Sequence, residues 1–303
     1  MNILNAIGNT QMIELININP FKPRVKLLGK LESTNPGGSI KDRAALFMIK
    51  AAESTGELHE NMTIIEATSG NTGISLAMIG ASMKYKVKLF MPECVSSERK
   101  AILSAMGADV ILTSGRKGTD GAAAALQEIY SQNPDDYYWP NQFKNQNNVL
   151  AHYETTGPEI FRQTGGRLDA VVAGIGSTGT ITGIGKYIKQ KKEEVMIVGI
   201  EPFEGHRIQG LKNLKESVVP EIFNPQAMDE KININDEDAF RMCRELAIKE
   251  GLLLGMSSGA IVAGALKIAE ALESGAIVAI LPDRGDRYLS TNLFRSYCGN
   301  CPP

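Results

Sequence analysis

A lysine in a glycine-rich turn is the residue of this 303-residue sequence with the clearest capacity for covalent chemistry. The segment NPGGSIKDR, residues 35–43, places Lys41 at the start of a helix whose apolar face would be formed by Ala44, Ala45 and Met48. Helix N-termini disfavour positive charge, which lowers the pKa of an amine and keeps it nucleophilic. Lys41 is therefore a candidate for forming a Schiff base with a carbonyl group, and a solvated turn lysine is the alternative.

A glycine-rich loop between a predicted strand and a predicted helix is a candidate anion site. Residues 174–179 read GIGSTG, which matches G-x-G-x-x-G, and Glu201 follows about 20 residues later, as in dinucleotide sites. A nicotinamide-dependent dehydrogenase is therefore one interpretation. The hydroxyl groups of Ser177, Thr178 and Thr180 equally suit a terminal phosphate at the positive end of the helix dipole.

Two other loops rich in small polar residues precede predicted helices. EATSGNTG, residues 66–73, offers amides and hydroxyls to a carboxylate, and Asn71 to a ring hydroxyl or carbonyl. GMSSG, residues 255–259, matches the G-x-S-x-G of α/β-hydrolases, but all 3 histidines precede Ser257, whereas that triad ends on a histidine. A hydrolase is disfavoured, and Ser257 is interpreted as a ligand-binding hydroxyl or a helix cap.

Short apolar segments alternate with helical patterns and must position these loops. The predicted strands are apolar on both faces, as in parallel sheets, and cover residues 25–31, 62–66, 87–91, 110–113, 170–174, 195–200 and 276–281. Helical spacing follows Ser97 and Asp236. The fold class is therefore α/β, doubly wound, with mostly parallel sheets. Because the polar loops follow strands in both halves of the chain, we expect them to bind one ligand between two domains.

Two long polar segments separate the predicted elements. Residues 132–148 predict a crossing between domains, because they are rich in Asn, Gln, Asp and Pro. Residues 202–229 predict a functional loop, because they are long and irregular.

Composition narrows the function classes further. Lys+Arg 32 against Asp+Glu 34 gives a net charge of −2, which argues against a nucleic-acid partner. No uninterrupted apolar stretch reaches about 18 residues and the first residues do not form a leader, so we expect a cytoplasmic protein without membrane attachment. Cys298 and Cys301 form a C-x-x-C without a second ligand pair, so no metal site is predicted. The two remaining interpretations of this segment are a frayed tail and a redox-sensitive tail.

The loops NPGGSIKDR, TSGNTG, GSTGT and GMSSG occur in this order in one family. The chain resembles the pyridoxal-phosphate enzymes of the tryptophan-synthase-β-like fold (fold type II), and among them the O-acetylserine sulfhydrylases, or cysteine synthases, of the B type. The resemblance extends from residue 7 to residue 291. One departure is Gln11, which stands where the family usually has proline.

The resemblance implies roles for individual residues around pyridoxal 5'-phosphate. Lys41 would be the catalytic residue that binds the cofactor covalently, Asn71 would bind its 3-hydroxyl and Ser257 would face its ring nitrogen. The residues implied for the cofactor phosphate are Gly176, Ser177, Thr178, Gly179 and Thr180. The residues implied for the substrate carboxylate are Thr68, Ser69, Gly70, Thr72 and Gln142. Lys212 would contact an anionic group of the substrate, with a solvated lysine as the alternative.

The resemblance also implies an architecture and an activity. A smaller domain of residues 36–145 would pack against a larger domain of residues 1–35 and 146–303, with the active site in the cleft between them. The enzyme would form a homodimer that acts on small molecules and would make L-cysteine or S-sulfocysteine by β-replacement. The substrates would be O-acetylserine or O-phosphoserine with sulfide or thiosulfate. Cystathionine β-synthase and hydrogen-sulfide-producing cysteine β-lyase activities would need the same residues and stay open, as does a cofactor-binding regulatory or scaffold protein.

Overall fold

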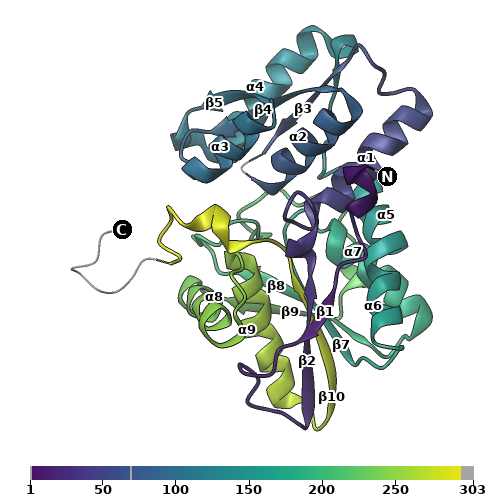
Figure 1. Cartoon of the computed structure of the whole chain (residues 1–303), viewed down its shortest axis with the longest axis vertical. Coiled ribbons are helices and arrows are strands. Elements are labelled where there is room, and N and C mark those ends of the chain that lie inside the picture. Colours follow the sequence, from purple (N-terminus) through teal and green to yellow (C-terminus); the bar gives the residue numbers. More distant parts are fainter. Residues whose placement is uncertain (1, 69, 295–303) are drawn as a thin grey trace, which may run out of the picture.

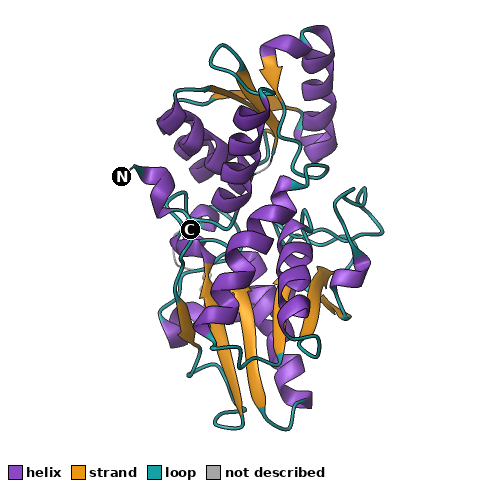
Figure 2. Ribbon diagram, turned by 90° about the vertical axis from the view of Figure 1, so that its right-hand side faces the viewer, coloured by secondary structure: helices purple, strands orange, loops and turns teal. Residues whose placement is uncertain are grey.

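The computed structural model describes residues 2–68 and 70–294, which form two sheets, each with its own helices (Figures 1 and 2). A four-stranded sheet lies at the top of Figure 1 and a six-stranded sheet lies below it. This is the α/β architecture with mostly parallel sheets that the alternating pattern predicts.

The six-stranded sheet has the order β1-β2-β10-β7-β8-β9. Its strands are β1 (Met12–Glu14), β2 (Val25–Leu31), β7 (Ala170–Gly174), β8 (Met196–Pro202), β9 (Glu230–Ile234) and β10 (Gly275–Leu281). Only the β1–β2 pair is antiparallel among these described pairings. Strand β7 shows why the sheet is covered on both faces. Its residues Ala170 and Val172 face one apolar core, and Val171 and Ala173 face another, because successive side chains alternate across a strand.

The four-stranded sheet is parallel and has the order β5-β4-β3-β6. Its strands are β3 (Thr63–Ala67), β4 (Lys86–Pro92), β5 (Asp109–Thr113) and β6 (Tyr137–Tyr138). Neighbouring residues of β3 again enter different cores, Ile64 on one face and Ile65 on the other. The two sheets therefore have separate hydrophobic cores.

The helices divide between these cores. Those that bury residues in the cores of the four-stranded sheet are α1 (Lys41–Thr55), α2 (Asn71–Met83), α3 (Ser97–Ala105) and α4 (Gly118–Gln132). Helices α6 (Gly157–Gln163) and α7 (Gly179–Lys191) cover one face of the six-stranded sheet, and α8 (Asp236–Glu250) and α9 (Met256–Ala271) cover the other. Helix α5 (Asn147–Ala151) packs against α1 and α7 and leads into a π-helical turn, His152–Thr156.

The predicted strands are confirmed to within two residues at either end. The sequence patterns miss β1, β6 and β9, which are edge strands without continuous apolar runs. Leu254, which precedes the GMSSG loop, forms an isolated bridge with Arg284 outside the named strands. Residues 202–229 are irregular as expected, apart from the short turn Pro225–Ala227. No helix of the described ranges combines the length and the apolar character that a membrane span requires.

Candidate active site

The polar loops predicted from the sequence meet between the two sheets. Lys41, the first residue of α1, donates from Nζ to Ser177 Oγ in the loop after β7, at 3.0 Å. Asn71, the first residue of α2, donates from Nδ2 to Asp283 Oδ2 after β10, at 2.7 Å. Asn71 follows β3 of one sheet and Asp283 follows β10 of the other, so loops at strand ends of the two sheets face each other here.

The start of α1 is held by residues on either side of Lys41. Asp42 accepts a hydrogen bond from the Gly37 N–H at 2.6 Å and one from the Ser75 hydroxyl at 2.5 Å. The Ile40 N–H donates to the carbonyl of Pro282 at 2.8 Å, which ties α1 to the strand end of β10. The lysine amine is therefore presented from a backbone that is fixed to both halves of the molecule.

A buried charge network lies behind this helix start. Arg43 Nε contacts Glu32 at 2.7 Å, its Nη1 contacts Glu159 at 2.6 Å, and Lys30 Nζ contacts Glu159 at 2.7 Å. Burial disfavours the ionised form of Glu159, but hydrogen bonds and charge from Arg43 and Lys30 outweigh it and lower its pKa to about 2. The network joins α1 to β2 and α6, so it anchors the turn that carries Lys41.

The pKa of Lys41 is lowered to about 8, mainly because burial disfavours its charged form. The charge of Glu66 opposes this shift, whereas the positive charge of Lys212 adds to it. The lowering expected from the sequence is thus present, with burial in place of the helix N-terminus as its main cause. An amine with this pKa is nucleophilic near neutral pH.

The 174–180 loop, whose Ser177 contacts Lys41, contains backbone N–H groups without a backbone partner. Within the described ranges, the N–H groups of residues 176–181 donate no backbone hydrogen bond, and Thr178 at the N-cap of α7 has a φ of 68°. A Cβ on Gly176 would lie 2.6 Å from the carbonyl oxygen of Gly210, so only glycine fits this close approach. The loop combines free donors with the positive end of a helix dipole, which is the chemistry of a phosphate site.

The 68–72 loop and Gln142 are also brought together. Thr72 Oγ1 donates to Gln142 Oε1 at 2.8 Å, and the Gly70 N–H donates to Thr68 Oγ1 at 3.2 Å. Ser69, predicted to belong to the same group, lies outside the described residues. Arg99 of α3 packs beside Gly70, hydrogen-bonds Gln209 and lies 4.8 Å from the centre of the Tyr288 ring.

Glu66, the penultimate residue of β3, is a buried acid beside this loop. Its Oε1 accepts from Trp139 Nε1 at 3.2 Å and from the Ala67 N–H at 3.0 Å, whereas Oε2 has no hydrogen-bond partner among the described residues. Burial raises the pKa of Glu66 to about 7, although the hydrogen bonds from the Trp139 and Ala67 N–H groups act in the opposite direction. Asn141 has a φ of 46°, in the left-handed region that is uncommon for residues with a Cβ.

The side chains of Ser257 and Asn71 differ in their hydrogen bonding. Ser257 is buried in the first turn of α9, and its hydroxyl has no hydrogen bond to the described residues. The N-cap of α9 is Gly255, so the interpretation of Ser257 as a cap is wrong. Asn71 already bonds Asp283 through Nδ2, and it accepts from Arg287 through Oδ1, which leaves one N–H and one lone pair for a ligand.

Lys212 lies on the side of the site formed by the 202–229 segment. Its Nζ is 4.5 Å from the centre of the Phe143 ring, and its N–H donates to the carbonyl of Ile175 at 2.8 Å. Burial lowers its pKa, and its charge acts on Lys41. Lys212 is therefore a partly buried cation near the amine, in contrast to a solvated loop lysine.

Sequence reasoning missed the site's internal partners Asn148, Asp283 and Arg287. Asn148 belongs to residues 132–148, which the sequence pattern predicts to be a crossing between domains. The many Asn and Gln side chains of that segment are the sequence feature that could have indicated a binding role. Asp283 and Arg287 follow the last predicted strand, so their position at a strand end could have drawn attention to them. Each is buried, and each has a buried polar atom without a partner among the described residues.

Comparison with known proteins identifies the family. A profile described as "Pyridoxal-phosphate dependent enzyme" matches residues 3–283. The chain belongs to this family. The enzyme therefore uses pyridoxal phosphate, and the described residues fit it. They offer one lowered-pKa amine for its aldehyde and a run of unpaired N–H groups for its phosphate.

The enzyme is similar over nearly its full length to proteins named cysteine synthase. It is 46% identical over 289 residues to "Cysteine synthase B" of Escherichia coli (strain K12), covering 95% of this chain and 94% of that one. The crystal structure of Cysteine Synthase (OASS) from Entamoeba histolytica matches with a TM-score of 0.91 and 40% identity, covering 97% and 90% of the two chains. The crystal structure of a hydrogen sulfide-producing enzyme from Fusobacterium nucleatum matches with a TM-score of 0.90 and 39% identity, covering 95% and 99%. The tryptophan-synthase-β-like fold predicted for the chain agrees with these neighbours.

The family assignment leaves the dehydrogenase interpretation without support. A dinucleotide site would need a free acid at Glu201, yet this carboxylate accepts from the Leu214 N–H at 2.9 Å and contacts Lys231 at 2.7 Å. The described ranges hold no cluster of His, Cys, Asp and Glu suited to a metal ion. Cys298 and Cys301 lie outside the described residues, so the ideas about the tail stay predictions.

Proposed function

We propose that the enzyme makes L-cysteine by β-replacement of an activated serine, with O-acetylserine or O-phosphoserine as the amino acid. The observation that carries the proposal is the contact between Lys41 Nζ and Ser177 Oγ at 3.0 Å, which places the amine beside the unpaired N–H groups of the 174–180 loop. Full-length similarity to proteins named cysteine synthase supports the choice of reaction.

Each loop has a separate task in this proposal. Pyridoxal phosphate, when bound, supplies an electron-withdrawing ring that stabilises negative charge at Cα of the amino acid. Residues 176–180 bind its phosphate, Asn71 binds its 3-hydroxyl, and Ser257 faces its ring nitrogen with a neutral hydroxyl. Thr68, Ser69, Gly70, Thr72 and Gln142 bind the amino-acid carboxylate.

Lys41 is the base of the reaction. Its amine removes the proton from Cα of the bound amino acid, and the electron pair expels the β-substituent as acetate or phosphate. A sulfide or thiosulfate anion then forms the new C–S bond at Cβ, and Lys41 returns the proton to Cα. The pKa of about 8 allows the free amine to exchange a proton near neutral pH.

Lys212 selects for anionic substrates in the same proposal. Its ammonium is partly buried and lies over the Phe143 ring, and it forms no ion pair within 4 Å among the described residues, although the charge of Asp120 acts on it from farther away. A phosphate leaving group or thiosulfate would supply that counter-charge. Lys212→Ala should therefore reduce kcat/KM for O-phosphoserine and thiosulfate more than for O-acetylserine and sulfide. Equal losses for all of them would contradict this role.

A second activity is favoured by one observation, the similarity to a hydrogen sulfide-producing enzyme at 39% identity. Product analysis separates the possibilities. Purified enzyme is mixed with O-acetylserine or O-phosphoserine and then with sulfide, thiosulfate or homocysteine, and products are identified by mass spectrometry. Cysteine or S-sulfocysteine, absent with Lys41→Ala, is the expected result. Cystathionine as the main product would favour a cystathionine β-synthase. In a separate assay with cysteine as substrate, sulfide release faster than cysteine synthesis would favour a cysteine β-lyase.

We also propose the domain division 36–145 against 1–35 and 146–303, a homodimer, and a cytoplasmic location. The separate cores of the two sheets support the division. Light scattering on the purified enzyme tests the dimer, and a single-chain mass would exclude it.

A further inference from the structure

The buried side chain of Asn148, in the first turn of α5, joins two loops of the site. Its Nδ2 donates to the carbonyl oxygen of Gln142 at 2.7 Å and to Ser177 Oγ at 3.1 Å. Both N–H bonds of the amide are therefore in use. The reverse orientation would set Oδ1 against the Gln142 carbonyl oxygen, so the amide has one favourable orientation.

Each end of this bridge continues into a different part of the site. Beyond Gln142 lies the 68–72 loop, because Gln142 Oε1 accepts from Thr72 Oγ1 at 2.8 Å. Beyond Ser177 lies the amine, because Ser177 Oγ accepts from Lys41 Nζ at 3.0 Å. One amide thus connects the carboxylate-binding side to the lysine and the phosphate-binding side.

The bridge also determines what Ser177 can donate. A hydroxyl has two acceptor lone pairs and one proton. Ser177 Oγ accepts from both Lys41 and Asn148, so both lone pairs are occupied and its proton is left to donate. That proton suits an anion at the N-terminus of α7. Asn148 Oδ1 has no partner in the described ranges, and a Cβ on Gly179 would collide with it, so the amide also lies against the first residue of α7.

We propose that Asn148 is a positioning residue that couples the 68–72 loop to the 174–180 loop, so that its loss weakens both amino-acid binding and cofactor binding. The proposal rests on the proposed function of these two loops. Asn148 touches neither ligand in it. It acts by holding Gln142 at one end and Ser177 at the other.

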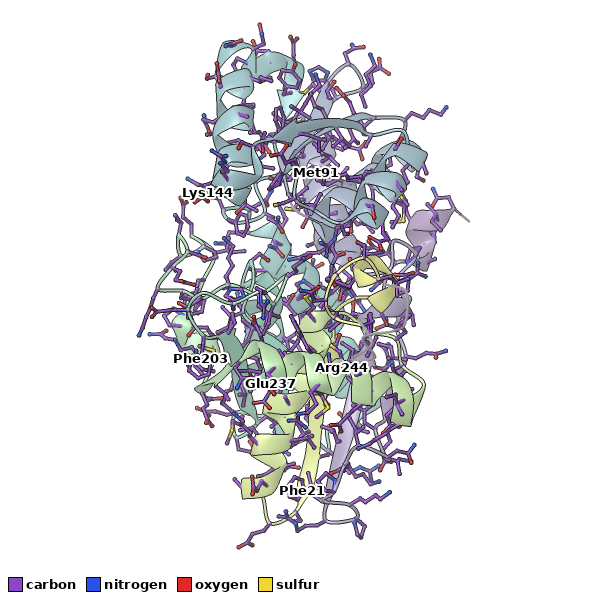
Figure 3. The ribbon with its side chains drawn as sticks, turned by 90° about the vertical axis from the view of Figure 1, so that its left-hand side faces the viewer. Phe21, Met91, Lys144, Phe203, Glu237 and Arg244 are labelled. Carbon is purple, nitrogen blue, oxygen red and sulfur yellow. The ribbon has the colours of Figure 1, made fainter. Side chains whose placement is uncertain are left out.

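The experiment compares Asn148→Ala and Asn148→Asp with a matched control, Asn19→Ala. Asn19 is equally buried and donates to the carbonyl of Val25 at 2.8 Å. Its Oδ1 accepts from the N–H of Phe21, which lies at the far end of the molecule from the four-stranded sheet (Figure 3). The dissociation constant of pyridoxal phosphate is measured on apo protein by absorbance. Half-saturation by O-acetylserine is measured on the holoenzyme from the change in cofactor absorbance, without a sulfur donor.

Both Asn148 variants should raise both constants, by about tenfold for the loss of one or two hydrogen bonds. Asn148→Asp keeps the shape of the side chain but replaces its donors with a charged acceptor, whereas Asn148→Ala removes both the donors and the volume without adding charge, so a loss common to both variants reports the missing donors. Asn19→Ala should lower the melting temperature and leave both constants unchanged. An unchanged cofactor constant in both Asn148 variants, or equal changes in Asn19→Ala, would overturn the proposal.

A double substitution tests the route through Gln142. In a Thr72→Val background, Asn148→Ala should no longer raise the O-acetylserine constant, but should still weaken cofactor binding. If Asn148→Ala raised the O-acetylserine constant by the same factor in the wild-type and Thr72→Val backgrounds, Asn148 would act independently of the 68–72 loop. That result would refute the coupling. The cofactor measurement needs no turnover, so an enzyme that binds cofactor normally but makes no cysteine would refute the proposed function and leave this test intact.

Discussion

Replacing Glu66 with glutamine and Lys212 with methionine should move the pH dependence of cofactor capture in opposite directions. Capture requires the neutral amine of Lys41 to attack the aldehyde of pyridoxal phosphate. The charge of Glu66 raises the pKa of that amine and the charge of Lys212 lowers it. Glu66→Gln should therefore lower the pKa of Lys41, and Lys212→Met should raise it.

The pKa of about 8 sets the scale of the effect in the unmodified enzyme. At pH 7 roughly one amine in ten is neutral, about 300 times the fraction for a lysine with the ordinary pKa of 10.5. The capture rate should therefore rise by up to about tenfold per pH unit below pH 8 and level off above it, with a smaller slope where Glu66 becomes protonated near pH 7.

Stopped-flow absorbance measures this rate when apo protein is mixed with pyridoxal phosphate at a series of pH values. Lys215→Met is the matched control, because Lys215 belongs to the same segment but is exposed and contacts Glu204 at 3.8 Å. Lys215→Met should leave the midpoint of the plot of capture rate against pH unchanged. A rate that still rises at pH 10 would show that Lys41 has an ordinary pKa. If the midpoint pH of Glu66→Gln and that of Lys212→Met moved in the same direction, the opposite effects assigned to the two charges would be refuted.

Substitutions at three other positions have defined outcomes. Glu159→Gln should cost about 3 kcal/mol of unfolding free energy at pH 7, because the ionised form is stabilised by a pKa lowered from 4.5 to about 2. That stabilisation is complete above about pH 4.5 and is lost as the pH falls toward 2, so urea unfolding of wild type and variant should converge in acid. Ser257→Asp should favour conversion of the cofactor to its amine form, detected by absorbance, since a carboxylate would stabilise the protonated form of the ring nitrogen; Ser257→Ala should not. Gly179→Ala should lose cofactor on desalting, because the added methyl group collides with Asn148, and retention equal to wild type would contradict the packing of α7.

The extent of sequence-based prediction can be judged from particular residues. Lys41, Asn71 and the 174–180 loop were located because each follows a predicted strand or turn and opens a helix. The strand β9 was missed because its residues alternate in polarity and lie at a sheet edge. The segment around Gln142 was read as a crossing, and the sequence pattern contained no indication that the short strand β6 within it pairs with β3.

The alternation of strands and helices, the reactive lysine and the anion-binding loops can be predicted from one sequence, because they depend on local periodicity and on the chemistry of neighbouring residues. The tertiary structure is needed for the cause of the lowered pKa of Lys41, which is burial and the charge of Lys212 acting against the charge of Glu66. It alone revealed the bridge from Asn148 to Gln142 and Ser177. Most of these interactions join residues that are far apart in the sequence. They depend on which strand ends become neighbours, and the order of the strands in a sheet is a property of the whole chain.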